Sequence, residues 1–168
     1  MMWEMSHRAD PKAAAIADRH YNRQKIGAPQ FVPPGRCIVL YTKTSTGEAL
    51  WVTSWPYAQY VKHDWAGAWI CSLFRNEGAG FASDLIREAV AATKAVYGDP
   101  PTMGLVTFLD TAKVQPIMTH HRPTFGRTWI MAGFHPCGYT KGGLMAFQLD
   151  PADMPDPCPP RGFQEALL

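Results

Sequence analysis

The sequence predicts an α/β (α+β) fold, with a mixed central sheet flanked by helices in a single domain. Two observations lead to this prediction. Apolar, strand-like runs alternate with amphipathic, helix-like segments between residues 9 and 149, a pattern typical of helices packed in layers on a sheet. The chain also has 168 residues, of which 46% are hydrophobic, which is enough for one domain with a substantial core.

The N-terminal part of the chain is predicted to form a helix and a β-hairpin. Residues 9–25 favour a helix because Asp10 can cap its N-terminus and Pro11 suits the first turn. The prolines and glycines that follow predict a loop. Residues 36–56 contain two β-branched and aromatic runs on either side of a Ser-Thr-Gly turn, which indicates a hairpin.

The central and C-terminal segments continue the alternation. An apolar strand is expected at residues 68–74, an amphipathic helix at 79–97 and a second apolar strand at 103–110. Residues 111–125 are expected to form a long basic loop. The remaining elements are a short helix at 126–134, a pair of strands at 135–150 and a proline-rich tail at 151–168, which we expect to be loosely attached.

The composition restricts the classes of function. The formal net charge of +2 neither requires nor excludes a nucleic-acid partner. None of the four cysteines belongs to a Cys-x-x-Cys pair or lies at zinc-finger spacing from a histidine, so we expect reduced thiols and a cytoplasmic protein. No long apolar stretch occurs near the first residues and no run of about 18 apolar residues occurs elsewhere, so we expect neither a secretory signal nor a membrane partner.

The most informative stretch is Arg-Asn-Glu-Gly-Ala-Gly, residues 75–80, between the predicted strand and the predicted long helix. The first N–H groups of a helix have no partner within the helix and carry partial positive charge. Glycines let the backbone approach a ligand closely, so the stretch could cradle a phosphate or pyrophosphate. A simple strand-to-helix turn is the alternative, and Glu77 favours it because a carboxylate repels phosphate. The residues assigned to cofactor binding are Phe74, Arg75, Asn76, Gly78, Ala79 and Gly80.

This order of segments resembles the GNAT superfamily of acyl-CoA-dependent N-acyltransferases. In that family the motif R/Q-x-x-G-x-G/A follows the fourth strand and its loop binds the CoA pyrophosphate. A helix, a fifth strand, another helix and a Gly-Phe step then lead into a final strand pair. Corresponding segments run here from residue 36 to residue 149, with Gly133 and Phe134 as the Gly-Phe step. The resemblance implies a GNAT-like acyltransferase domain over residues 1–150 that uses acetyl-CoA or another acyl-CoA.

Two further motifs resemble a narrower branch, the bacteriophage Mom DNA-modification proteins. That branch has a His-Tyr pair followed by a basic residue near the end of its first helix, as in His20, Tyr21 and Arg23 here. It also has an Asp at the end of the fifth strand, matched by Asp110, and then a short helix that begins with glycine, matched by GRTWIMAGF at residues 126–134. The resemblance implies an anti-restriction enzyme that modifies the exocyclic amine of adenine in DNA, with His20, Tyr21 and Asp110 as catalytic residues.

One position departs from the pattern of that branch. Where the branch has a tyrosine in the last helix, this chain has Trp129. An indole cannot act as a general acid, so the role of that tyrosine does not transfer. Tyr139 is nearby in the sequence and is the hydroxyl that could replace it.

Each candidate catalytic residue also has a structural explanation. His20 or Asp110 could accept the proton that an amine loses when it attacks a thioester. A His-Tyr pair at the end of a helix, however, also serves packing and capping, and an Asp at the end of a strand often starts an Asx-turn. His20 and Asp110 alone are too few ligands to predict a metal site.

Two alternative functions stay open at this point. The chain could be a GNAT acetyltransferase acting on a small-molecule or peptide amine, or a non-catalytic DNA-binding domain with a GNAT fold. A basic segment is compatible with contact to a DNA backbone, although an ordinary solvated loop also explains it; it contains Lys113, His120, His121, Arg122 and Arg127. The acyl group, metal involvement and oligomeric state, including a homodimer, are not determined by the sequence.

Overall fold

The computed structural model describes residues 1–164 of the chain. Its helices are α1 (Pro11–Asp18), α2 (Ala82–Tyr97) and α3 (Arg127–Met131), with short 3-10 turns at η1 (Ala58–Tyr60) and η2 (Pro151–Asp153). The strands are β1 (Glu4–Met5), β2 (Cys37–Lys43), β3 (Glu48–Ser54), β4 (Trp69–Glu77), β5 (Leu105–Leu109), β6 (Ile117–Thr119), β7 (Arg122–Thr124), β8 (His135–Tyr139) and β9 (Met145–Leu149).

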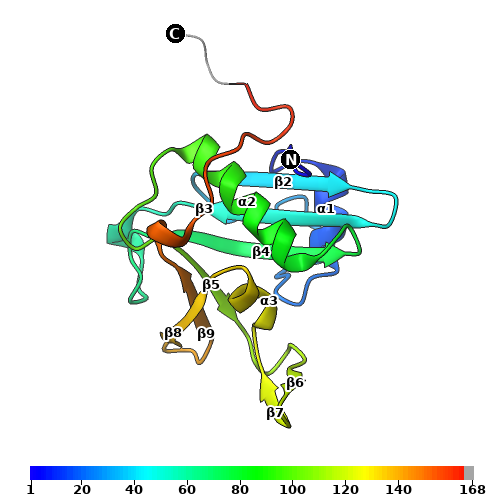
Figure 1. Ribbon diagram of the computed structural model, residues 1–168. Coiled ribbons are helices and arrows are strands. Elements are labelled where there is room, and N and C mark those ends of the chain that lie inside the picture. The colour runs from blue at the N-terminus through cyan, green and yellow to red at the C-terminus, as the bar shows by residue number, and fades with distance from the viewer. Residues whose placement is uncertain (165–168) are drawn as a thin grey trace.

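Seven of the strands form one mixed sheet in the order β1-β2-β3-β4-β5-β9-β8. Neighbouring strands are antiparallel except β4 and β5, which run parallel and are connected through α2. Strands β6 and β7 form a separate hairpin, which projects from the lower end of the domain in Figure 1. The predicted α/β (α+β) class, with a mixed sheet and flanking helices in a single domain, is confirmed for residues 1–164.

The two faces of the sheet are covered differently. On one face α2 and α3 pack on a core that contains Trp51, Trp69 and Phe147, each fully buried. On the other face α1 covers β2, β3 and the middle of β4 through buried residues such as Ile16, and the segment around Trp65 covers β4, β5 and β9. These two covers form separate apolar clusters, and a cleft lies between them.

Helix α1 is shorter than the sequence predicts. Asp10 caps its N-terminus by accepting a hydrogen bond from the Lys12 N–H, as expected. The helix ends at Asp18 rather than at residue 25, and the N–H groups of Arg19 and His20 donate to carbonyls three residues earlier. The chain leaves the helix here because the side chains that follow bond to β4 instead.

The segment predicted as a basic loop contains the β6–β7 hairpin. Its two-residue turn consists of His120 and His121, whose φ angles are 51° and 63°. Such turns usually contain glycine or asparagine, which adopt positive φ readily, and Pro123 within β7 also disfavours a strand. The usual sequence signals for a hairpin are therefore missing, which explains the wrong prediction.

The expectation of a loosely attached tail is wrong for residues 151–164. The Cys158 N–H donates to the Ala91 carbonyl of α2, and Arg161 exchanges backbone hydrogen bonds with Trp3 and Met5. Met154 is buried in the main core. The tail thus crosses α2 and pairs with the N-terminal strand. Residues 165–168 of the predicted tail lie outside the described part of the chain.

Gly126, the N-cap of α3, gives a test of the packing between α3 and the sheet. Its φ angle is +68°, and a Cβ there would lie 2.3 Å from Cζ of the fully buried Phe147. We expect Gly126→Ala to lower the free energy of unfolding by about 2–3 kcal/mol, because it strains the backbone and displaces a core ring. Urea denaturation measures the change. Gly142→Ala, where only Thr140 Oγ1 comes within 3.9 Å of the new methyl group, is the matched control and should change stability by less than about 0.5 kcal/mol.

Candidate active site

The candidate site lies where β4 and β5 diverge. The two strands pair only through residues 69–71 and 105–107. Strand β5 then ends at Leu109, while β4 continues along β3 as far as Glu77. A β-bulge accompanies the divergence, because Val52 and Thr53 of β3 face Leu73 and Cys71 and leave Ser72 as an extra residue. The edge of β4 that faces β5 is therefore open from Ser72 onward.

The segment after α1 bonds to this open edge. His20 Nε2 lies 3.1 Å from the Phe74 carbonyl oxygen, and the Asn22 side-chain amide donates to the Ser72 carbonyl at 2.8 Å. Arg23 holds the segment by pairing with Asp18 at 2.8 Å. The basic residue of the His-Tyr-basic motif thus has a structural role here.

His20 is engaged at both ring nitrogens. A carbonyl oxygen can only accept, so Nε2 carries the hydrogen in the bond to Phe74. Nδ1 lies 2.8 Å from the Asn22 side-chain oxygen and 3.3 Å from the Asn22 backbone nitrogen. Burial lowers the pKa of His20, and the charge of Arg75 lowers it further, while the hydrogen bonds to Asn22 and Phe74 act in the opposite direction. We interpret His20 as a group that fixes the segment after α1 on β4, because both ring nitrogens are engaged by protein groups, rather than as a base open to substrate.

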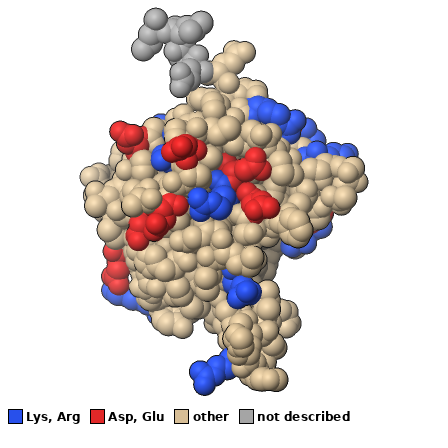
Figure 2. All heavy atoms as spheres, viewed as in Figure 1, with Lys and Arg blue, Asp and Glu red and all other residues tan. Residues whose placement is uncertain are grey.

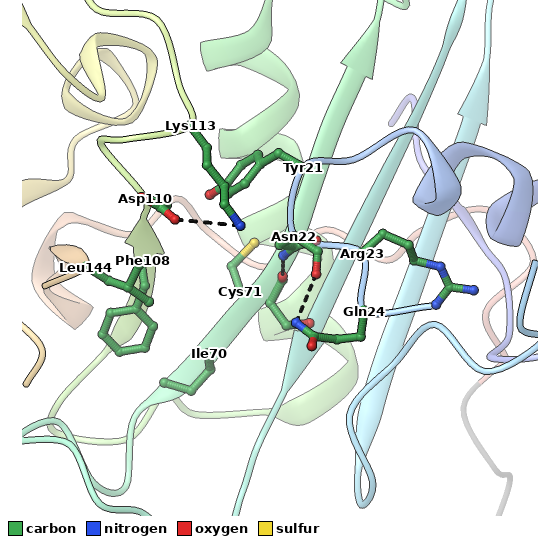
Figure 3. A pocket seen from close by; sticks show the side chains of 11 residues that line it. Tyr21, Asn22, Arg23, Gln24, Ile70, Cys71, Phe108, Asp110, Lys113 and Leu144 are labelled. Carbon is green, nitrogen blue, oxygen red and sulfur yellow. Dashed lines mark hydrogen bonds and ion pairs between the residues drawn. The ribbon is translucent and has the colours of Figure 1, made fainter. Parts of the chain in front are cut away.

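A cleft of about 470 Å³ separates this segment from the end of β5 (Figure 3). Residues 21–24 line one side, and Asp110 and Lys113 line another. Ile70, Phe108 and Leu144 supply an apolar surface. The rest of the lining is polar, so the cleft combines this apolar part with a larger set of hydrogen-bonding groups. A smaller hollow of about 190 Å³ adjoins the cleft between β4 and β5 and reaches Trp129.

The structure brings Tyr21 and Asp110, both predicted to be catalytic, to this one cleft. In Figure 3 the Tyr21 hydroxyl points toward the side where Asp110 and Lys113 lie. Burial raises the pKa of Tyr21, and the Asp110 carboxylate raises it further, while the Asp110 backbone acts in the opposite direction. Tyr21 is thus a hydroxyl that keeps its proton and can donate it in a hydrogen bond. The His20 ring lies against it, with centroids 4.5 Å apart.

Asp110 forms an Asx-turn and also lines the cleft. Its Oδ1 accepts from the Ala112 N–H at 3.0 Å, which is the expected Asx-turn. Its Oδ2 lies 3.9 Å from Lys113 Nζ, and the side chain is 28% exposed. One carboxylate oxygen is therefore held by the turn, and the other is accessible from the cleft.

Ser72 is a polar residue of the site that the sequence did not indicate. Its hydroxyl is buried and has no hydrogen-bond partner within residues 1–164. It lines both the cleft and the adjoining hollow. Buried hydroxyls without a partner are uncommon, and this one belongs to a residue that borders both hollows. Only the bulge in β4 places it there, and no local motif marks it.

The glycine loop is largely satisfied by its own side chains. Asn76 Oδ1 accepts from the N–H groups of Gly78 at 3.2 Å and Ala79 at 2.9 Å, and Asn76 Nδ2 donates to the Gly80 carbonyl. Further along, no protein group within residues 1–164 accepts a hydrogen bond from the N–H groups at the start of α2, residues 81–84. These N–H groups are the ones available to an anion.

Arg75, assigned to the cofactor, is paired with Glu77 through Nε at 2.7 Å. Arg19 binds the same carboxylate at 2.7 Å. Glu77 therefore does not project as a free negative charge toward the loop. Arg19, Arg75 and Glu77 together carry one net positive charge. Phe74, the first residue assigned to the cofactor, packs its ring against Trp51 and Trp129 and offers only its backbone to the open edge.

The two arginines make stability depend on pH. Hydrogen bonds from Arg19 and then Arg75 hold the pKa of Glu77 at about 2, below its ordinary value of 4.5. A carboxylate with a lowered pKa stabilises the folded state above its unfolded pKa and loses this effect as pH falls toward the folded pKa. We expect the urea-unfolding free energy of Glu77→Gln to depend less on pH between 4.5 and 2 than that of the wild type. A pH dependence equal to that of the control Asp99→Asn would contradict the prediction.

Trp129 of α3 and Tyr139 of β8 have different environments. Trp129 is buried, and its ring meets Phe74 and Phe134 edge to face. Tyr139 is 62% exposed on β8 and lines a separate hollow with Trp65 and Lys141. Tyr139 therefore does not supply a hydroxyl to the cleft, and Tyr21 is the tyrosine that lines it.

Within residues 1–164, no group of three His, Cys, Asp or Glu side chains could hold a metal ion. No helix of this part of the chain is long and apolar enough to span a membrane. Comparisons of the chain with protein-family models, curated proteins and solved structures found no match.

Proposed function

We propose that the chain is a GNAT-fold, acyl-CoA-dependent N-acyltransferase, and that its acceptor is the exocyclic amine of adenine in DNA, as in Mom-like proteins. The observation that carries the proposal is the divergence of the parallel strands β4 and β5 beside a cleft lined by Tyr21, Ser72 and Asp110. The open edge of β4 leads from this cleft to the unpaired N–H groups of α2.

The order of elements supports the same proposal. The GNAT pattern expects the glycine motif between a fourth strand and a helix, then a fifth strand, a short helix and a final strand pair. Residues 69–149 follow this order through β4, α2, β5, α3, β8 and β9, with the β6–β7 hairpin inserted after β5. The glycine motif lies at the junction of β4 and α2.

Two parts of a CoA ester have matching groups in the structure: the pyrophosphate, and the arm that joins it to the thioester. A pyrophosphate suits the N–H groups at residues 81–84, because helix N-termini bind anions. The open edge of β4 offers backbone groups at the side of the hollow between β4 and β5. Binding along this edge competes with the His20 and Asn22 contacts, so we expect the segment after α1 to shift when the ligand enters.

The residues of the cleft suit attack by an amine on an acyl group. The acyl-CoA supplies a thioester, whose carbonyl carbon is the electrophile. Asp110 is placed to accept the proton that the amine nitrogen loses as its bond to that carbon forms. The C–S bond then breaks and CoA leaves as the thiolate. Tyr21, whose hydroxyl keeps its proton, can donate a hydrogen bond to the carbonyl oxygen as negative charge develops there, or to the departing sulfur.

Calorimetry with acetyl-CoA and variants of Ala82 tests the cofactor site. Ala82 is the first residue of α2, where proline is favoured, and Phe81 before it already has the extended backbone that proline requires. Ala82→Pro removes one unpaired N–H and should weaken acetyl-CoA binding about tenfold without loss of stability. Ala82→Gly keeps the N–H and is the control. Absence of both binding heat and thermal shift for the wild type at millimolar acetyl-CoA would refute the cofactor assignment.

Mass spectrometry of nucleosides from cells that express the chain tests the acceptor. A new adenosine mass that disappears in the Asp110→Asn variant supports DNA modification. Unmodified nucleosides together with acetyl-CoA binding would favour the alternative, an acetyltransferase for a small-molecule or peptide amine. DNA binding with a steep salt dependence and no CoA affinity would favour a non-catalytic DNA-binding domain.

A further inference from the structure

The β6–β7 hairpin has no role in the acyl-transfer chemistry described above, although it lies next to the site. The foot of the hairpin shares a hollow of about 170 Å³ with Trp129, lined by Ile117 and Thr124. Trp129 and Val114 also line the hollow beside Tyr21. The hairpin thus projects from the rim of the candidate active site.

The pairing of the two strands gives the hairpin distinct faces. Ile117 pairs with Thr124, and both face the hollow at its foot. Met118 pairs with Pro123 in the alternate register, and Met118 is 64% exposed. The hairpin therefore presents an apolar pair away from the hollow and places Arg122 next to the turn.

The hairpin belongs to a stretch of the sequence that contains basic residues and no acidic ones. All 14 Asp and Glu residues of the chain lie outside residues 111–149, a stretch that contains Lys113, Arg122, Arg127 and Lys141. Arg122 and Arg127 are exposed and have no ion pair within residues 1–164. The projecting lower part of the molecule shows blue atoms and no red ones in Figure 2. Such a surface suits a polyanion.

The tip of the hairpin carries two histidines in a conformation that glycine or asparagine adopts more easily. His120 and His121 both have positive φ, and both are exposed. Local folding does not favour histidine in such a turn. The two imidazoles can exchange hydrogen bonds with phosphates or base edges, which glycine cannot do.

We propose that the β6–β7 hairpin enters a groove of duplex DNA beside the cleft, with Arg122 on the backbone and Met118 against the base stack. The inference rests on the proposed function for the identity of the acceptor. A two-stranded ribbon fits the major groove of B-DNA, whereas the deep, narrow major groove of an RNA duplex excludes it. An enzyme that modifies a paired base must take that base out of the stack, and an inserted apolar side chain promotes this step.

Fluorescence measurements on the full chain without acyl-CoA test the inference, using a labelled DNA duplex and the same duplex with 2-aminopurine in place of adenine. Arg122→Gln should weaken duplex binding and reduce the log–log salt slope by about 1. Wild-type binding should raise the 2-aminopurine fluorescence, because the base leaves the stack. Met118→Ala should leave the affinity within about threefold of that of the wild type, because it removes no charge, but it should abolish this rise in fluorescence. Lys43→Gln, which removes an exposed charge at the far end of β2, should match the wild type in both assays.

Three results would overturn the inference: no duplex binding by the wild type, no effect of either hairpin variant, or equal binding of duplex RNA or an acidic peptide. Acetyl-CoA calorimetry on the same variants separates this inference from the proposed function. Hairpin-dependent DNA binding without acetyl-CoA binding would remove only the transferase proposal. Acetyl-CoA binding that all variants retain, without hairpin-dependent DNA binding, would remove only the role of the hairpin.

Discussion

If the chain catalyses the proposed acyl transfer with Asp110 as general base, replacing Asp110 with asparagine is expected to reduce the rate by about 10²–10⁴-fold, the usual contribution of such a base. An amide cannot accept the proton that the attacking amine loses. The fold should be unaffected, because the asparagine oxygen can still accept the Ala112 N–H and preserve the Asx-turn. The lost pairing with Lys113, 3.9 Å away and largely exposed, should matter little for stability.

Single-turnover measurement of modified adenine separates this effect from a change in binding. Asp150→Asn is the matched control, because Asp150 also follows a strand end and pairs with His135, but it lies outside the cleft. Tyr21→Phe should give a smaller reduction, since it removes a hydrogen-bond donor and leaves the base in place. A rate for Asp110→Asn within threefold of the wild type would exclude Asp110 as the base.

The fold was predictable because its signals are local. The turn between β2 and β3, the apolar runs of β4 and β5 and the amphipathic pattern of α2 each occupy a few adjacent residues. Where tertiary contacts replace local signals, the prediction was wrong. The His20 and Asn22 side chains bond to β4 instead of prolonging α1, and two histidines occupy a turn that sequence rules assign to glycine.

The candidate site was predictable only in part. Tyr21 and Asp110 were suggested by family motifs, since no local pattern indicates that these two residues share a cleft. The position of Ser72 in the cleft depends on a β-bulge, and the pairing of β4 with β3 decides where that bulge occurs. The glycine motif correctly located the junction of β4 and α2, but it could not show that Asn76 would occupy two of the N–H groups.

Trp129→Ala is expected to lower the free energy of unfolding by about 3–5 kcal/mol, as is typical when a large aromatic ring is removed from a core. Trp129 is 8% exposed and contacts Trp51, Phe74 and Phe134. It lines both the hollow beside Tyr21 and the hollow at the foot of the hairpin. Its removal leaves a cavity and also takes away the wall between the site and the hairpin.

Urea denaturation measures this loss, with Ile130→Ala as the control, because Ile130 is the next residue of α3 and is 40% exposed. Trp129→Tyr keeps a ring and should cost less, about 1–2 kcal/mol. It also installs the hydroxyl that the Mom-like pattern has in this helix, so an increase in transfer rate would indicate that the hydroxyl acts in the hollow beside Tyr21. A loss below about 1 kcal/mol for Trp129→Ala would mean that the ring does not support the sheet.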